Sequence, residues 1–158
     1  MSLTVKQLGD HGEDFTSDLL LSRGFSVQKL PVNAPTYDLV VTRGQTSFRV
    51  SVKVSRQKQH VRLGARKSVQ GLEAGNFLFA YVPAPGGEIR SLGESAFTLL
   101  ILPAELVREG SLAIHDKYWH DRQRDPSIFS VMVKGYDRHG GPTWTAWQAY
   151  REAWHLLP

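Results

Sequence analysis

Two short stretches decide the fold: residues 37–41 read YDLVV, and residues 48–54 read FRVSVKV. Both are rich in residues that favour strands, and a tight turn at residues 43–45 can join them. The sequence therefore predicts neighbouring strands at residues 37–42 and 47–55. Asp38 stands at the head of the first strand, and Lys53 stands late in the second.

Side chains in a strand alternate between the two faces of the sheet. One face of the second strand would carry the apolar side chains of Phe48, Val50, Val52 and Val54. The other face would carry Ser51 and Lys53. Because burying an ammonium group is costly unless it is paired, we expect an anion near Lys53, and Asp38 can supply it. Glu13, in a predicted helix at residues 9–23, can close over the same spot.

This combination of side chains suits metal-assisted hydrolysis of a phosphodiester. Carboxylate oxygens are preferred ligands of Mg²⁺, so Glu13 and Asp38 are candidate ligands, and the backbone carbonyl of Val52 is a further one. A bound Mg²⁺ or Mn²⁺ would polarise the phosphate and lower the pKa of a bound water. Lys53 would orient that water or stabilise the developing charge.

The remaining elements are predicted from periodicity and from turn signals. Asp10 can cap the first helix and Gly24 can end it. Further strands are expected at residues 25–30, 76–82 and 97–102, with an added edge strand at 129–133. Residues 57–74 are expected to be a loop that leads into a short helix at 69–73. Other helices are expected at residues 103–108 and 144–157, with a polar loop at 115–126.

The order of these elements predicts an α/β fold: an α/β/α sandwich with a central mixed sheet and a C-terminal helical extension. With 158 residues, the chain is long enough for one domain with a proper core. We therefore expect a single domain over residues 1–158, with a core at about 9–108 and an extension at about 109–158.

Glu13, the stretch at 37–41 and the stretch at 50–53 resemble the PD-(D/E)XK nuclease superfamily, in its resolvase-like branch. The strand at 97–102 and the short helix after it are also similar to small members of that group. The resemblance implies a restriction endonuclease-like fold and a metal-dependent endodeoxyribonuclease. It makes Asp38 a metal ligand, Lys53 the catalytic lysine and Glu13 the helix-borne acid.

Ser51 departs from the family pattern, which places an acid or a glutamine two residues before the lysine. It occupies a catalytic position, but serine is neutral and is a poorer Mg²⁺ ligand than a carboxylate. The loss should weaken metal binding and water activation. Glu73 and Gln70 are candidate replacements from the segment that follows.

The charge distribution points to a polyanionic partner. The net charge is +4, and no acidic residue lies between Asp38 and Glu73. A one-signed segment repels itself unless a polyanion is near, and nucleic acid, DNA above all, is the expected partner. The alternative is a solvated basic face. The candidate contacts are Arg49, Arg56, Lys58, Arg62, Arg66 and Lys67.

Several classes of protein are excluded or disfavoured by composition. The chain has no cysteine, which excludes disulfides and thiolate zinc sites. It shows no secretory signal and no apolar run of the roughly 20 residues that span a bilayer. We therefore expect a cytoplasmic protein without a membrane partner.

Other patterns carry weaker hypotheses. Trp147, Tyr150 and Trp154 would share one stripe of the C-terminal helix, and this stripe is expected to pack in the core, in a homodimer or on bases. The two His-Asp pairs, at 115–116 and 120–121, do not have structural-zinc spacing and are interpreted as part of a polar loop.

Three functions are compatible with the sequence. The first is a metal-dependent nuclease that acts through Glu13, Asp38 and Lys53. The second, motivated by Ser51, is a catalytically inactive nucleic-acid-binding domain on the same fold. The third is a protein-interaction module, antitoxin-like or an assembly subunit, whose contact is the C-terminal helix. In purely structural terms, Glu13 would be an exposed acid, Asp38 a strand-start cap and Lys53 an ordinary sheet-face lysine.

Overall fold

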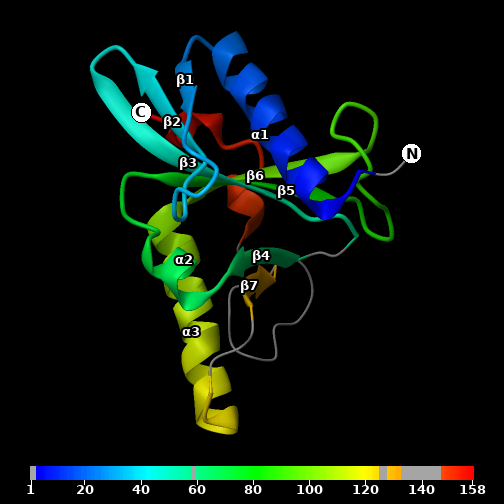
Figure 1. Cartoon of the computed structure of the whole chain (residues 1–158), viewed down its shortest axis with the longest axis vertical. Coiled ribbons are helices and arrows are strands. Elements are labelled where there is room, and N and C mark those ends of the chain that lie inside the picture. Colours follow the sequence, from blue (N-terminus) through cyan, green and yellow to red (C-terminus); the bar gives the residue numbers. More distant parts are fainter. Residues whose placement is uncertain (1–2, 58–59, 125–127, 133–146) are drawn as a thin grey trace.

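A five-stranded sheet forms the centre of the fold in this computed structural model, which describes residues 3–57, 60–124, 128–132 and 147–158 (Figure 1). The strands lie in the order β1-β2-β3-β5-β6. β3 and β5 run parallel, and the other neighbours run antiparallel. The mixed central sheet predicted from the sequence is confirmed. Its strands are β1 (Ser26–Lys29), β2 (Leu39–Arg43), β3 (Thr46–Val54), β5 (Phe77–Pro83) and β6 (Phe97–Pro103).

Each face of the sheet has its own apolar layer. α1 (Val5–Ser22) packs on the face that carries Leu39, Val50 and Phe79. α2 (Arg66–Gln70) and α3 (Ala104–Arg122) lie on the opposite face, which carries Leu78 and Leu100 (Figure 1). β5 is buried along its whole length, as expected of a strand covered on both faces. The predicted α/β/α sandwich is therefore confirmed.

α1 begins earlier than the predicted start at Gly9. Thr4 caps it: the Thr4 hydroxyl accepts a hydrogen bond from the Gln7 N–H at 3.1 Å, and the Gln7 side chain accepts one from the Thr4 N–H at 2.9 Å. This reciprocal capping box sets the start at Val5. The prediction of Asp10 as the cap was wrong because the Thr4–Gln7 pair is the stronger local signal.

The other end of α1 falls where the sequence predicts it. Gly24 has a positive φ of 88°, which a residue without a Cβ adopts freely. The Phe25 N–H donates to the Leu20 carbonyl at 3.1 Å, and the Gly24 N–H donates to the Leu21 carbonyl at 3.1 Å. These are the two bonds of a Schellman motif, which turns the chain directly into β1.

The approach of α1 to β3 depends on Gly12. A Cβ at this position would lie 2.5 Å from Cγ2 of Val54 and 3.3 Å from Cγ1 of Val52, whereas a Cβ at Gly9 would meet nothing within 4 Å. We expect Gly12→Ala to lower the free energy of unfolding by about 1–3 kcal/mol. Gly9→Ala should raise it by up to about 1 kcal/mol, because alanine is the better helix former. Urea denaturation of both variants measures the difference, and equal stabilities would contradict the close approach.

The segment between β3 and β5 holds a strand that was predicted to be loop. This strand is β4 (His60–Gly64), and it pairs with β7 (Phe129–Met132) in a separate two-stranded sheet. Val61 and Leu63 are buried and Arg62 is exposed, so the period-two pattern was present but masked by the surrounding basic residues. The strand predicted at 129–133 is confirmed, although it does not extend the main sheet.

α3 is longer than the helix predicted at residues 103–108. It continues to Arg122 and therefore includes most of the region predicted as a loop at 115–126. His120 and Asp121 lie in its last turn, where the two side chains are 3.3 Å apart and that of His120 is 85% exposed. Within the described ranges, no helix is long and apolar enough to cross a membrane.

The C-terminal segment is not the helix predicted at residues 144–157, of which residues 144–146 lie outside the described part. It contains two short 3-10 turns, η1 (Gln148–Tyr150) and η2 (Trp154–Leu156). Between these turns, the backbone of Arg151 forms an isolated antiparallel β-bridge with Leu100 of β6. The Glu152 N–H donates to the Leu99 carbonyl at 2.9 Å. The segment thus covers the outer edge of β6.

The aromatic stripe expected on that helix is also wrong. Trp147 is fully buried in the layer on the α3 side, where Tyr150 packs beside it. Trp154 packs on the α1 side, with its ring centroid 5.6 Å from that of Phe79. The chain crosses the edge of the sheet between Trp147 and Trp154, so the two side chains pack on opposite faces of the sheet.

Candidate active site

Asp38 lies where β2 separates from β3. The last paired residues are Leu39 and Val50, and the Asp38 N–H donates to the Val50 carbonyl at 2.9 Å. Beyond this point, Oδ2 of Asp38 accepts a hydrogen bond from the Val52 N–H at 2.7 Å. The N–H and C=O of one residue in a strand face the same neighbour. The Val52 carbonyl therefore also faces the side on which Asp38 lies.

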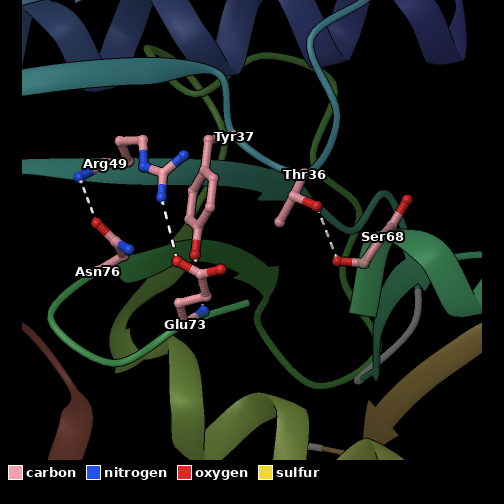
Figure 2. Close-up of polar contacts among 6 residues, drawn as sticks. All are labelled: Thr36, Tyr37, Arg49, Ser68, Glu73 and Asn76. Carbon is pink, nitrogen blue, oxygen red and sulfur yellow. Dashed lines mark hydrogen bonds and ion pairs between the residues drawn. The ribbon is translucent and has the colours of Figure 1, made fainter. Parts of the chain in front are cut away.

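The chain just before Asp38 is held against α2 and the loop that follows it (Figure 2). The Thr36 hydroxyl donates to the Ser68 carbonyl at 3.0 Å, and the Glu73 N–H donates to the Tyr37 hydroxyl at 2.9 Å. Thr36 adopts a positive φ of 70°, which a β-branched residue does only under constraint. Asp38 is therefore fixed by β3 on one side and by the α2 region on the other.

Arg49 and Glu73 are engaged in the same network. The Arg49 guanidinium lies 4.6 Å from the centroid of the Tyr37 ring and 3.4 Å from Oε2 of Glu73, while the Arg49 N–H donates to the Asn76 side chain at 2.8 Å (Figure 2). Glu73, considered as a replacement acid, is thus paired with Arg49. Gln70, the other candidate, is exposed on α2.

Glu13 approaches Asp38 from α1, one residue beyond the close contact at Gly12. The side chains of Glu13 and Asp38 lie close enough for each to affect the pKa of the other. Partial burial, together with the charge of Asp38, raises the pKa of Glu13 to about 7. Burial also raises the pKa of Asp38, but the Val52 N–H, the Lys53 ammonium and the hydrogen bond with Glu13 oppose that rise. Near neutral pH the Glu13 carboxyl group of the folded protein is therefore close to its pKa and only partly ionised.

This raised pKa predicts how stability depends on pH in the absence of metal. The pKa of Glu13 moves from 4.5 to about 7, so within that window the folded carboxyl group keeps a proton that the unfolded one has released. Its contribution is fully present below pH 4.5 and is lost as the pH rises through 7. Glu13→Gln should remove this loss, a difference of about 1–2 kcal/mol at pH 8 after allowance for solvent screening.

Urea melts of the wild type and Glu13→Gln at pH 5 and pH 8 measure the effect. Glu109→Gln is the matched control, because Glu109 is an exposed acid on α3. If wild type and Glu13→Gln lost the same stability between the two pH values, the pKa of Glu13 would not be raised in the folded protein.

Ser51 and Lys53 lie on the face of β3 away from α1, since their register partners in β5 belong to the layer on the α3 side. Ser51 is 1% exposed. Lys53 is half-buried, and its charge acts on Asp38. The structure thus brings Glu13, Asp38 and Lys53 together, from one helix and two neighbouring strands. In the part of the chain that the structure describes, no group of three or more His, Asp and Glu side chains could hold a metal.

Two further charges around Glu13 were missed in the sequence. The charge of Asp10 raises the pKa of Glu13, and the charge of Lys29 lowers it. Lys29 also pairs with Asp14 of α1. The spacing of Asp10 and Glu13 on one helix face was readable from the sequence. The approach of Lys29 could not be read from the sequence, because it depends on how β1 packs beside α1.

A cleft of about 530 Å³ opens beside Lys53, between the start of α1, the end of β3 and the β4–β7 pair. Lys53, Arg56 and Arg62 line it. Arg56 donates from Nη2 to the Leu3 carbonyl, whereas its Nε is buried and has no hydrogen-bond partner among the described residues. The cleft is therefore a cationic hollow that shares Lys53 with the candidate site.

The other basic residues predicted to bind nucleic acid are spread more widely. The Arg66 guanidinium lies over the Phe129 ring, 5.7 Å from its centroid, and Lys67 is exposed on α2. Arg49 lies in the Tyr37 network, and Lys58 lies outside the described residues. Two of these arginines thus lie against aromatic rings of the fold, Arg49 over Tyr37 and Arg66 over Phe129.

The sheet order and the helical layers are those of a restriction endonuclease-like fold. The chain is similar in structure to a bacterial homing endonuclease, I-Ssp6803I, with a TM-score of 0.58 and 20% sequence identity over 98% of this chain and 93% of that one. It is also similar to the Holliday junction resolvase Hjc of Archaeoglobus fulgidus, with a TM-score of 0.49 and 17% identity over 78% of this chain and 83% of that one.

No protein-family model matches the sequence, and no curated protein matches it at the level of sequence. The similarity to the solved structure therefore shows the fold alone.

Proposed function

We propose that the chain, acting as one domain over residues 1–158, binds DNA and hydrolyses its phosphodiester bonds with the help of Mg²⁺ or Mn²⁺. One observation carries this proposal: Glu13 approaches Asp38 where the charge of Lys53 acts on Asp38, and Lys53 lines a cationic cleft. The fold supports it, because the bacterial neighbour on this fold is an endonuclease by name. If both strands of a duplex are cut, two such sites are needed, so a homodimer belongs to the proposal.

The donor groups suit a hard divalent cation. Glu13, Asp38 and the Val52 carbonyl offer only oxygen, which Mg²⁺ and Mn²⁺ accept. Two neighbouring carboxyl groups repel each other when both are ionised. A cation bound between them removes this repulsion. When bound, the metal supplies the charge that polarises a phosphate and lowers the pKa of a water.

The protein side chains would do the remaining work. Asp38 would keep its orientation through the hydrogen bond from the Val52 N–H. Lys53 places an ammonium where charge develops on the phosphate. Arg56 and Arg62 attract the phosphates on either side, and salt would weaken this attraction.

Ser51 favours a second candidate, DNA binding without cleavage. The position is buried and neutral, and the described residues offer no third carboxylate beside Asp38. This candidate predicts binding that is sensitive to salt without turnover. The protein-interaction module loses its expected contact, because Trp147 is buried in the core and the predicted C-terminal helix is not formed by the described residues.

Cleavage assays decide between the candidates. Single-stranded, duplex and four-way DNA would be incubated with EDTA, Mg²⁺ or Mn²⁺, with binding followed in parallel over a range of salt. We expect metal-dependent cleavage that falls by about 100-fold or more in Lys53→Ala. Lys6→Ala, an exposed lysine of α1 outside the site, should cleave like the wild type. Salt-sensitive binding without cleavage by either metal would favour the second candidate, and the lack of any DNA binding would refute both.

A further inference from the structure

We propose that the cleft beside Lys53 holds a single unpaired nucleotide of the DNA, so that the preferred substrate carries a nucleotide outside the helical stack. This inference rests on the proposed function, because it takes DNA as the ligand. It adds a substrate class and a site for one base.

The cleft has two walls of different chemistry. Lys53, Arg56 and Arg62 form the cationic wall, and Val5, Leu8 and Ile128 contribute apolar surface. An unpaired nucleotide has the same division, with an anionic phosphate and a base whose flat face is apolar. The volume of about 530 Å³ lies within the range of about 300–1,000 Å³ that is typical of sites for small organic ligands.

The apolar wall is exposed where packing alone does not require it. Val5 is 82% exposed and Ile128 is 37% exposed. They come from segments far apart in the sequence, the first turn of α1 and the residue before β7, yet both line this cleft. Enzymes that take up an extruded base hold it between apolar or aromatic side chains in this way.

The cationic wall suits a phosphate group. None of the described residues that line the cleft is acidic. The exposed side chain of Arg62 and the half-buried side chain of Lys53 can give a phosphate charge-assisted hydrogen bonds.

Lys53 links this cleft to the carboxyl pair. It lines the cleft, and its charge acts on Asp38. A phosphate held by Lys53 would therefore lie between the carboxyl pair and the nucleotide in the cleft, which places the unpaired nucleotide next to the bond to be cut. Extrusion costs least for a base that is already unpaired, so such DNA should be favoured.

Fluorescence anisotropy in EDTA tests the inference without cleavage. Three DNAs of one sequence are compared: a paired duplex, a duplex with one bulged nucleotide, and the same bulge without its base. We expect the bulged duplex to bind at least about fivefold more tightly than the paired one, and the baseless bulge to bind like the paired duplex. Val5→Ser combined with Ile128→Ser should abolish this preference and keep the affinity for paired DNA.

Leu21→Ser combined with Val32→Ser is the matched control, because these side chains are 53% and 99% exposed and lie outside the cleft. It should retain the preference. Equal affinity for paired and bulged DNA, or a preference untouched by the Val5 and Ile128 changes, would overturn the inference while leaving the proposed function intact. If the protein prefers the bulged duplex but does not cleave DNA with either Mg²⁺ or Mn²⁺, only the catalytic proposal is refuted. A protein that binds none of the three DNAs would refute both.

Discussion

Asp38→Asn is expected to lower DNA cleavage by about 10²–10³-fold and to abolish the stabilisation that Mg²⁺ or Mn²⁺ gives the wild type. Asparagine has nearly the shape of aspartate, and its side-chain oxygen can still accept the hydrogen bond from the Val52 N–H that Asp38 accepts at 2.7 Å. The substitution therefore removes the negative charge and leaves the local geometry in place. Without that charge, the site keeps Glu13 as its one carboxyl group at this point.

The same change should not unfold the protein. Asp38 is part of the reason that the pKa of Glu13 rises, so neutralising it relieves repulsion in the metal-free site. We expect the stability of Asp38→Asn at pH 8 without metal to equal or exceed that of the wild type. This outcome would show that the substitution removes the metal site without unfolding the protein.

Cleavage rates and thermal melts over a range of metal concentration measure both effects. A metal that binds only the folded state raises the melting temperature as its concentration exceeds the dissociation constant. Asp18→Asn, an exposed acid on α1, is the control and should behave like the wild type. If Asp38→Asn kept the cleavage rate and the metal-induced shift, Asp38 would not be a ligand.

The central part of the fold was predictable because its signals are local. β2 and β3 are joined by a tight turn, so their register follows from alternation of apolar side chains, and this register puts Asp38 beside the end of β3. Gly24 fixes where α1 ends and therefore where β1 begins. The position of Glu13 was harder to predict, because it also requires α1 to pass close to β3. Gly12 permits this close approach.

The parts that failed depend on partners distant in the chain. β4 is a strand because β7 pairs with it, and the polar, basic context of Arg62 gave no hint of that pairing. Helical spacing made Trp147 and Trp154 look like one stripe, although the segment instead crosses the edge of β6. Spacing alone cannot report a chain that changes faces.

Charge composition did not indicate where each basic side chain would lie in the fold. The acid-free run between Asp38 and Glu73 predicted a basic surface. Arg49 from that run lies over Tyr37 and pairs with Glu73, so part of its charge is used inside the fold. What remains beside the candidate site is the narrower set at the cleft, and the apolar wall there had no signal in the sequence.

Ser51→Asp is expected to tighten binding of Mg²⁺ or Mn²⁺ by about tenfold or more, because affinity for hard cations rises with the number of anionic ligands. The site now has two carboxyl groups in contact, Glu13 and Asp38. Position 51 is two residues before Lys53 on the same face of β3 and is 1% exposed, so a third carboxylate there would be shielded from water. Cleavage should rise with metal occupancy.

The same substitution should weaken the metal-free protein. A buried carboxylate without a counterion costs about 2 kcal/mol or more, and a second like charge beside Asp38 adds to this. The loss should be larger at pH 8 than at pH 5, because protonation relieves it, and saturating metal should reverse it. Ser51→Ala should leave metal affinity almost unchanged, since a neutral hydroxyl contributes little to Mg²⁺ binding.

Titration calorimetry gives the metal affinity directly, and melts with and without metal give the stability. Ser47→Asp is the control for an added charge, because Ser47 lies on the same strand and is exposed. A folded Ser51→Asp protein with the wild-type metal affinity would show that position 51 does not face the cation, and the site built on Glu13, Asp38 and Lys53 would then need a different geometry. An increase confined to Ser51→Asp would show that position 51 faces the bound cation.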